Sequence, residues 1–171
     1  EIHERLVGSE MCIRDRSKQG MGTTLVVATI IDGKLYVANV GDSRLYIVND
    51  NIRQVTRDHS LVAEMVRLGE VDVAAAREHP DKNIITRAIG AKENVEADFF
   101  EVELQEGDRI VICTDGLTNM VEDEVIRNIV SCDISIEEKT ELLVKTANQN
   151  GGRDNITVMI IEPFMYQVKA C

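Results

Sequence analysis

The stretch "VANVGDSRLYIV", residues 37–48, decides the fold class of this chain. Two runs rich in β-branched and apolar residues flank a Gly-Asp-Ser turn, which is typical of consecutive strands. Upstream, "TTLVVATII" (23–31) meets "KLYVANV" (34–40) through Asp-Gly, the strongest short hairpin signal. Downstream, "RLYIVN" meets "IRQVT" through Asp-Asn. These segments predict an antiparallel meander of four strands.

Helices and further strands follow this meander. Ser60 as N-cap and Gly69 as stop delimit an expected helix, and a second short helix should end before Pro80. Ser135 and Glu138 form a capping-box pattern. The remaining expected elements are strands over 83–90, 98–105, 108–116 (central) and 155–162, and helices over 122–130 and 135–152. Together they predict an α+β sandwich.

Composition excludes several classes of protein. The net charge of -11 argues against nucleic acid as a partner, and no apolar run is long enough to cross a membrane. The four cysteines have neither zinc-site nor disulfide-framework spacing, which favours a reducing, cytoplasmic compartment.

Three aspartates stand at strand ends: Asp42, Asp115 and Asp154. Each alone is typical of a turn, because Asp and Gly favour turn geometry. Together they could converge at one end of the sandwich, where their mutual repulsion would favour a hard divalent cation such as Mg²⁺ or Mn²⁺.

A resemblance to a known family makes this cation-site hypothesis more specific. The stretches GMGTTLVVATI, VANVGDSRLYIV, QVTRDHS, HPDKNIITRAIG, GDRIVICTDGLTNMV and GGRDNITVMII resemble, in order and spacing, the motifs of the PPM (type 2C) metal-dependent Ser/Thr protein phosphatases, bacterial branch. The resemblance covers Gln19 to about Glu162. It implies a four-layer α/β/β/α sandwich of antiparallel sheets, here incomplete at the N-terminus.

The resemblance also implies roles for single residues. Asp115 and Asp154 match ligands of a binuclear Mn²⁺ or Mg²⁺ centre, and Asp42 matches a ligand of a third metal. Asn119 replaces an Asp of many relatives, which should weaken that third site, although its amide could still accept from a metal-bound water. Asn155 is expected to orient Asp154.

Residues 60–88 resemble the family's flap, which contributes to substrate choice. In it, Arg87 could attract a substrate phosphate or pair with an acidic neighbour, and His79 is either a flap contact or a turn residue before Pro80. His59 is expected to cap or pack a turn, and Cys113 to be a core residue rather than a nucleophile.

The family's N-terminal motifs, which carry further metal carboxylates, a phosphate-binding Arg and the bridging Asp, do not occur here. The retained chain therefore offers no catalytic residue of its own, and we expect it to be inactive or nearly so. We interpret residues 1–16 as non-native, 17–163 as a partial phosphatase domain and 164–171 as a tail.

Residues 6–16, "LVGSEMCIRDR", explain this interpretation. They match one reading frame of a transposon-end sequencing adapter, CTC GTG GGC TCG GAG ATG TGT ATA AGA GAC AGR. The alternative is a disordered natural leader. We predict adapter codons for Glu10 to Asp15 in the underlying nucleotide read; other codons at these positions refute the interpretation.

For the parent protein, the resemblance implies hydrolysis of phosphoserine and phosphothreonine in proteins by a metal-activated water. Phosphorylated proteins, including a Ser/Thr kinase, are the expected partners. The alternative is a catalytically silent phosphatase-like binding module, against which the retained aspartates argue. A related phosphatase acting on anti-sigma-factor antagonists is a third possibility, which "GDSR" and "GGRDNIT" disfavour.

Overall fold

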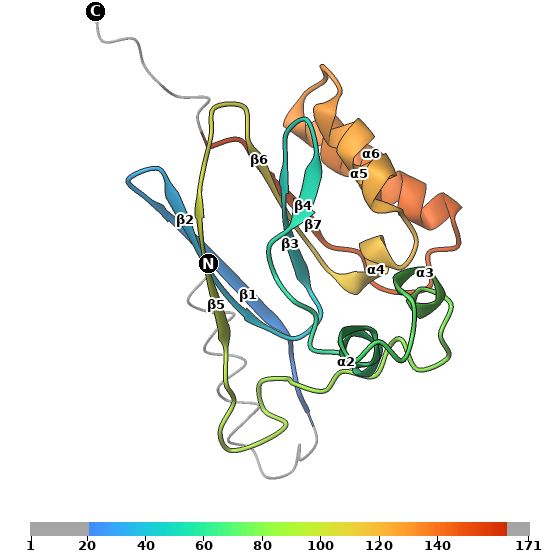
Figure 1. The fold of residues 1–171 in the computed structure, drawn as a ribbon. Helices are drawn as coiled ribbons and strands as arrows, with labels where there is room; N and C mark the ends of the chain where they lie inside the picture. Colours follow the sequence, from blue (N-terminus) through green and yellow to red (C-terminus); the bar gives the residue numbers. More distant parts are fainter. Residues whose placement is uncertain (1–20, 164–171) are drawn as a thin grey trace, which may run out of the picture.

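Two antiparallel sheets and a layer of helices make up the part of the chain that the computed structural model describes, residues 21–163 (Figure 1). The first sheet has the order β1-β2-β5 and the second the order β4-β3-β6-β7. The strands are β1 (Leu25–Ile31), β2 (Lys34–Val40), β3 (Arg44–Val48), β4 (Ile52–Gln54), β5 (Asp98–Glu103), β6 (Arg109–Cys113) and β7 (Val158–Ile161). The α+β class and the antiparallel sheets are confirmed.

The helices lie on one side of the second sheet and at its lower end in Figure 1. α5 and α6 cover the outer face of that sheet, whereas α2 and α3 lie beside its end. Their bounds are α2 (Leu61–Arg67), α3 (Val73–Ala76), α4 (Asp115–Thr118), α5 (Asp123–Ser131) and α6 (Ile136–Gln149). No helix in the described region 21–163 is long and apolar enough to cross a bilayer.

Two apolar cores hold three layers together. The core between the sheets contains Leu35, Val37 and Ile110, each at most 2% exposed. The core between the second sheet and the helices contains Val111, Ile126 and Leu143. The fourth layer of the predicted sandwich is not among residues 21–163, and on the outer face of the first sheet Phe99 is 79% exposed.

Local signals in the sequence are largely confirmed. The Asp32–Gly33 turn has positive φ at both residues, 50° and 77°, as a two-residue hairpin turn of this kind requires. The Ser60 hydroxyl accepts the Ala63 N–H at the start of α2. Ser135 and Glu138 form the complete capping box of α6.

Two predictions of secondary structure are wrong. The four strands do not form one meander, because β2 pairs with β1 and β5 while β3 pairs with β4 and β6. Residues 41–43 therefore carry the chain from one sheet to the other. Residues 83–90 form no strand; they contribute only single bridges, Ile85 to Ser60 and Ile89 to Thr23.

A close contact between two backbone segments holds the residues that follow β6 in place. A Cβ at Gly116 would lie 2.3 Å from the carbonyl oxygen of Asn155, so only glycine fits there. Thr114 supports the same contact, because its hydroxyl donates to that Asn155 carbonyl at 3.2 Å and accepts the Thr157 N–H at 3.0 Å. The loop before β7 is thereby held against the start of α4.

We predict that Gly116→Ala lowers the free energy of unfolding by about 2–3 kcal/mol, because the added methyl group must displace the Asn155 backbone. Gly69→Ala is the control: it adds only left-handed strain (φ 75°) in open space and should cost about 1 kcal/mol. Urea unfolding measures both. Only Gly116→Ala should move the amide resonances of residues 154–157; unmoved resonances there contradict the prediction.

Candidate metal centre

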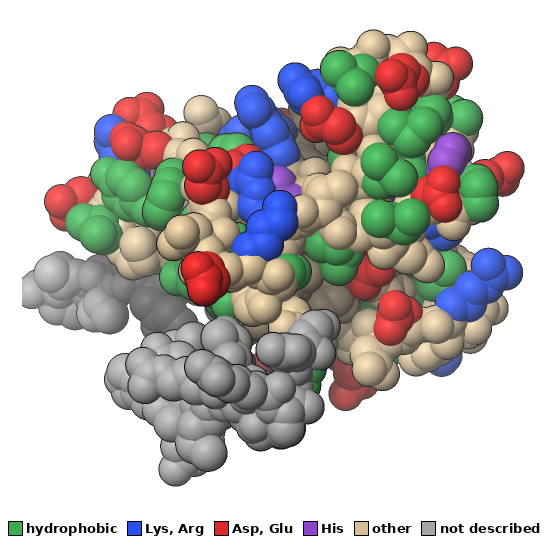
Figure 2. All heavy atoms as spheres, turned by 90° about the horizontal axis from the view of Figure 1, so that it is seen from below, with side chains coloured by type: hydrophobic (Ala, Val, Ile, Leu, Met, Phe, Trp, Pro, Cys, Tyr) green, Lys and Arg blue, Asp and Glu red, His purple; other side chains and the backbone are tan. Residues whose placement is uncertain are grey.

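A groove of about 1080 Å³ lies between the end of the second sheet and the α2–α3 segment. On this face Lys and Arg side chains gather beside a hollow, with Asp and Glu side chains among them (Figure 2). Asp42, Asp115, Asn119 and Arg87 line the groove, whereas Asp154, Asn155 and His79 lie outside its lining. The groove thus brings together four of the seven site residues predicted from sequence.

The register of two neighbouring strands sets the first pair of carboxylates. β3 and β6 are antiparallel, and Arg44 lies opposite Cys113. Asp42 precedes Arg44 by two residues and Asp115 follows Cys113 by two, so both carboxylates stand at the same end of this strand pair. Strand pairing therefore places two of the three predicted aspartates, Asp42 and Asp115, at one end of the sheet.

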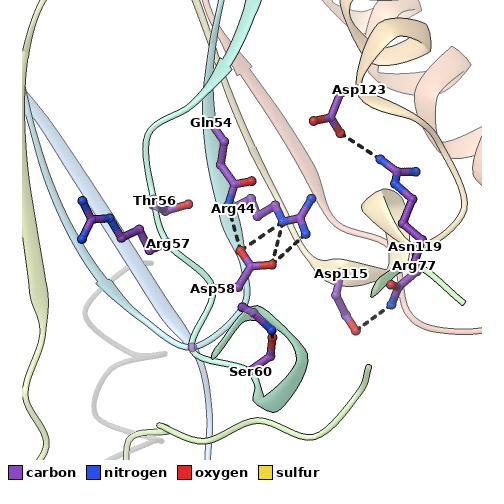
Figure 3. A network of polar contacts seen from close by, with 12 residues as sticks. Arg44, Gln54, Thr56, Arg57, Asp58, Ser60, Arg77, Asp115, Asn119 and Asp123 are labelled. Carbon is purple, nitrogen blue, oxygen red and sulfur yellow. Dashed lines mark hydrogen bonds and ion pairs between the residues drawn. The ribbon is translucent and has the colours of Figure 1, made fainter. Parts of the chain in front are cut away.

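Asp115 is the first residue of α4, and its carboxylate is held from its own helix. Asn119 Nδ2 donates to Asp115 Oδ2 at 3.2 Å, one helical turn on (Figure 3). Burial, and next the charge of Asp154, raise the pKa of Asp115 above its usual range. Asp154 therefore lies near enough to act on Asp115.

Asp154 itself is exposed, in the loop that Thr114 holds. Its Oδ1 accepts the Asn155 backbone N–H at 2.7 Å, so the contact uses the main chain of Asn155. A role for the Asn155 side chain in orienting Asp154 remains a prediction.

Asp42 is the most perturbed carboxyl of the three. It is only 9% exposed, and burial, followed by the charge of Asp115, raises its pKa to about 6. Carboxylates that raise one another's pKa lower their free energy when a cation joins them. Their oxygen donors suit Mg²⁺ or Mn²⁺, which prefer carboxylate ligands.

The described carboxylates do not form a complete metal site. Within residues 21–163, no group of three or more Asp, Glu, His or Cys side chains is close enough to hold an ion by itself. The donor chemistry therefore fits a hard divalent cation, but a complete coordination shell needs ligands beyond those in the described region.

An ion-pair network beside Asp42 was not predicted from the sequence. The Arg44 guanidinium donates three hydrogen bonds to Asp58, at 2.7–3.0 Å, and one to the Tyr46 hydroxyl at 2.9 Å (Figure 3). Gln54 Nε2 also donates to Asp58, at 2.8 Å. The Arg44 fork is thus occupied by protein groups and stiffens the groove wall.

The network continues toward the α2–α3 segment. Tyr46 donates to Asp123 at 3.4 Å, and Arg77, which follows α3, donates to the same carboxylate oxygen at 3.3 Å. Only the Arg in "GDSR" and the Asp in "RDHS" hinted at these partners. No local pattern joins residues so far apart in the chain.

The two predicted flap residues make contacts within the protein. His79 Nδ1 accepts the Asp81 N–H at 3.2 Å, as a turn residue would. Arg87 Nη1 donates to Asp98 Oδ1 at 2.7 Å. Burial alone would raise the pKa of Asp98, but hydrogen bonds from Arg87 and His59 outweigh it and hold that pKa below its usual value. A substrate role for His79 or Arg87 remains a prediction.

His59 and Cys113 agree with their expected roles. His59 is 8% exposed, lines the groove and accepts the Gly41 N–H through its ring. Cys113 is 2% exposed, and burial raises the pKa of its thiol to about 12, so it is not a nucleophile.

Comparison with known proteins identifies the family. The model of the family "Protein phosphatase 2C" matches residues 4–156. The chain belongs to the protein phosphatase 2C family. Two curated family members illustrate the similarity: protein phosphatase PhpP of Streptococcus pneumoniae (strain D39) and serine/threonine phosphatase stp of Listeria welshimeri, each 46% identical over 149 residues. These matches cover 86% of this chain but only 61% and 59% of those proteins, so the chain spans about three fifths of their length.

Solved structures of the family share the fold. Serine/threonine phosphatase Stp1 from Staphylococcus aureus superposes with a TM-score of 0.83 at 36% identity, covering 88% of this chain and 59% of that one. The catalytic domain of the phosphatase PstP, solved in complex with two manganese ions, gives a TM-score of 0.76 at 31% identity, covering 90% of this chain and 63% of that one. The fold class expected from the sequence is thus that of the family.

We predict that Asp42→Asn stabilises the metal-free chain above about pH 6, by roughly 1–3 kcal/mol. Between its ordinary value of 3.8 and about 6, the folded state holds the Asp42 proton more tightly than the unfolded state does. Stability therefore falls as pH rises through that window, and the asparagine variant avoids the loss.

Urea unfolding at about pH 4 and about pH 8 measures this difference. Asp32→Asn, in the exposed β1–β2 turn where asparagine is equally suited, is the matched control and should change little. An Asp42→Asn effect of equal size at both pH values contradicts the assignment.

Proposed function

We propose that the complete protein hydrolyses phosphoserine and phosphothreonine in other proteins. The proposal is supported by Asp42 and Asp115, which stand at one sheet end beside a groove, and by Asp154, whose charge raises the pKa of Asp115, in a member of the protein phosphatase 2C family. Phosphorylated proteins, including a Ser/Thr kinase, would be the substrates, and the cytoplasm would be the compartment.

Each polar residue at this end of the second sheet would have its own role in catalysis. Asp115 and Asp154 would hold two Mn²⁺ or Mg²⁺ ions together with ligands outside the described region, and Asp42 would contribute to a third. When bound, such ions supply the Lewis acidity that activates water for direct attack on phosphorus. Asn119 would keep the Asp115 carboxylate in one orientation through its 3.2 Å hydrogen bond.

The rest of the groove would bind and orient the substrate. The Arg44–Asp58 pair would provide a stiff wall, because both partners are already fully engaged. Residues 60–88 would contact the protein part of the substrate as a flap. The 171-residue chain by itself should hydrolyse slowly or not at all, since its described residues supply an incomplete coordination shell.

A catalytically silent binding module is the alternative, which a complete sequence without the N-terminal acidic motifs would support. The retained, mutually repelling aspartates argue against it, because a module without metal gains nothing from burying Asp42.

The test uses the complete protein, expressed from the recovered coding sequence, with Mn²⁺ and either p-nitrophenyl phosphate or a phosphothreonine peptide. We expect metal-dependent hydrolysis, and a loss of about 100-fold or more in kcat/KM for Asp115→Ala. Asp133→Ala, an exposed aspartate between α5 and α6, is the control and should retain full activity.

Two results would contradict the proposed function. Full activity of Asp115→Ala refutes the metal role of this carboxylate. Binding of the phosphopeptide without hydrolysis, in a complete protein that contains the missing acidic motifs, supports the binding module instead.

A further inference from the structure

Gly41, the residue before Asp42, is held on both sides by His59, through its N–H and its carbonyl. The Gly41 N–H donates to His59 Nδ1 at 3.0 Å, and the His59 N–H donates to the Gly41 carbonyl, also at 3.0 Å. Gly41 is buried with a φ of +111°, and a Cβ there would lie 2.3 Å from Thr24. Contacts with His59 and Thr24 therefore confine the backbone of Gly41.

These contacts also fix the tautomer of His59. Since Nδ1 accepts the Gly41 N–H, the ring proton lies on Nε2. Nε2 faces Asp98 Oδ2 at 3.3 Å, and Asp98 in turn accepts from Arg87 at 2.7 Å. Both ring nitrogens are thus engaged within the protein, which leaves His59 no free nitrogen for proton transfer to a substrate.

His59 also lies where the flap segment begins and returns. Ser60, the next residue, caps α2, and the Thr86 N–H donates to the His59 carbonyl at 2.8 Å. Arg87, the residue after Thr86, is joined to the His59 ring through Asp98, whose two oxygens face Arg87 Nη1 at 2.7 Å and His59 Nε2 at 3.3 Å. One buried side chain and its main chain therefore contact both ends of the segment and the peptide that carries Asp42.

We propose that His59 is a positioning residue for Asp42: by clamping the Gly41 peptide it fixes where the Asp42 carboxylate enters the groove, and through Asp98 and Arg87 it joins that carboxylate to the flap segment. The metal part of this inference rests on the proposed function. The clamp itself rests only on the contacts around Gly41 and His59.

Two substitutions of His59 test the contacts of Nδ1 and of Nε2 separately. In His59→Asn, the amide oxygen takes the place of Nδ1 and can still accept the Gly41 N–H, but nothing reaches Asp98. In His59→Gln, the longer amide reaches the position of Nε2 and can still donate to Asp98, but the acceptor for Gly41 is lost. Both variants remove the imidazole, so a loss of packing alone affects them alike.

The exchange measurement uses the ¹⁵N-labelled 171-residue chain. The metal titration, with Mn²⁺ alone as the probe, uses the ¹⁵N-labelled complete protein, because the described residues supply an incomplete coordination shell. We measure the hydrogen-exchange rate of the Gly41 amide and the Mn²⁺ concentration that half-broadens the Asp42 amide resonance. His59→Gln should raise both by about tenfold or more, as the loss of an outer partner of a metal ligand does. His59→Asn should leave both within about threefold of the unmodified chain.

Equal changes in the two variants, or faster exchange throughout the chain, overturn the positioning role in favour of general destabilisation. No faster exchange at Gly41 in His59→Gln overturns it outright. If Mn²⁺ fails to broaden the Asp42 resonance in the unmodified complete protein, the metal part of the proposal is wrong, and the exchange result still decides the clamp. An inactive complete protein refutes the proposed function, but it does not change what the Gly41 exchange rate and the Mn²⁺ titration say about His59.

Discussion

The register between β3 and β6 is the constraint on which this structure depends. With Arg44 opposite Cys113, the strand pair places Asp42 and Asp115 at one end, where burial first and neighbouring carboxylate charges second raise the pKa of each. A slip of one residue would turn every side chain of β3 to the other face and remove Tyr46 from the helix-side core. The cores on either side of the second sheet therefore fix the site as firmly as they fix the fold.

The surrounding groups serve this one end of the sheet. Thr114 and Gly116 bring the loop with Asp154 close, Asn119 holds Asp115 from within its helix, and the Arg44–Asp58 pair stiffens the wall next to Asp42. Such an arrangement limits the rearrangement that an arriving dication would require, because the carboxylates are already near one another.

Local signals allowed most elements to be predicted, and long-range pairing explains where prediction failed. The Asp32–Gly33 turn and the Ser135 capping box depend on neighbours in the chain, so the sequence was sufficient for them. Gly41 to Ser43 has the composition of a hairpin turn, yet the partners of β2 and β3 come from β5 and β6, far along the chain. The aspartates were found because each follows or precedes an apolar run, whereas the Arg44–Asp58 and Tyr46–Asp123 contacts leave no periodic pattern.

Both ends of residues 60–88 meet at His59, through Ser60 and Thr86. A segment whose ends are joined at one fixed point can change in length between those ends at little cost, since closing a longer loop costs only slowly growing entropy. Arg77 and Arg87 are the positions that tie it to the groups beneath, Asp123 and Asp98. The length of this segment can therefore vary while both of its ends stay in place. Such variation would reshape the rim of the groove without moving the end of the second sheet, which carries Asp42 and Asp115.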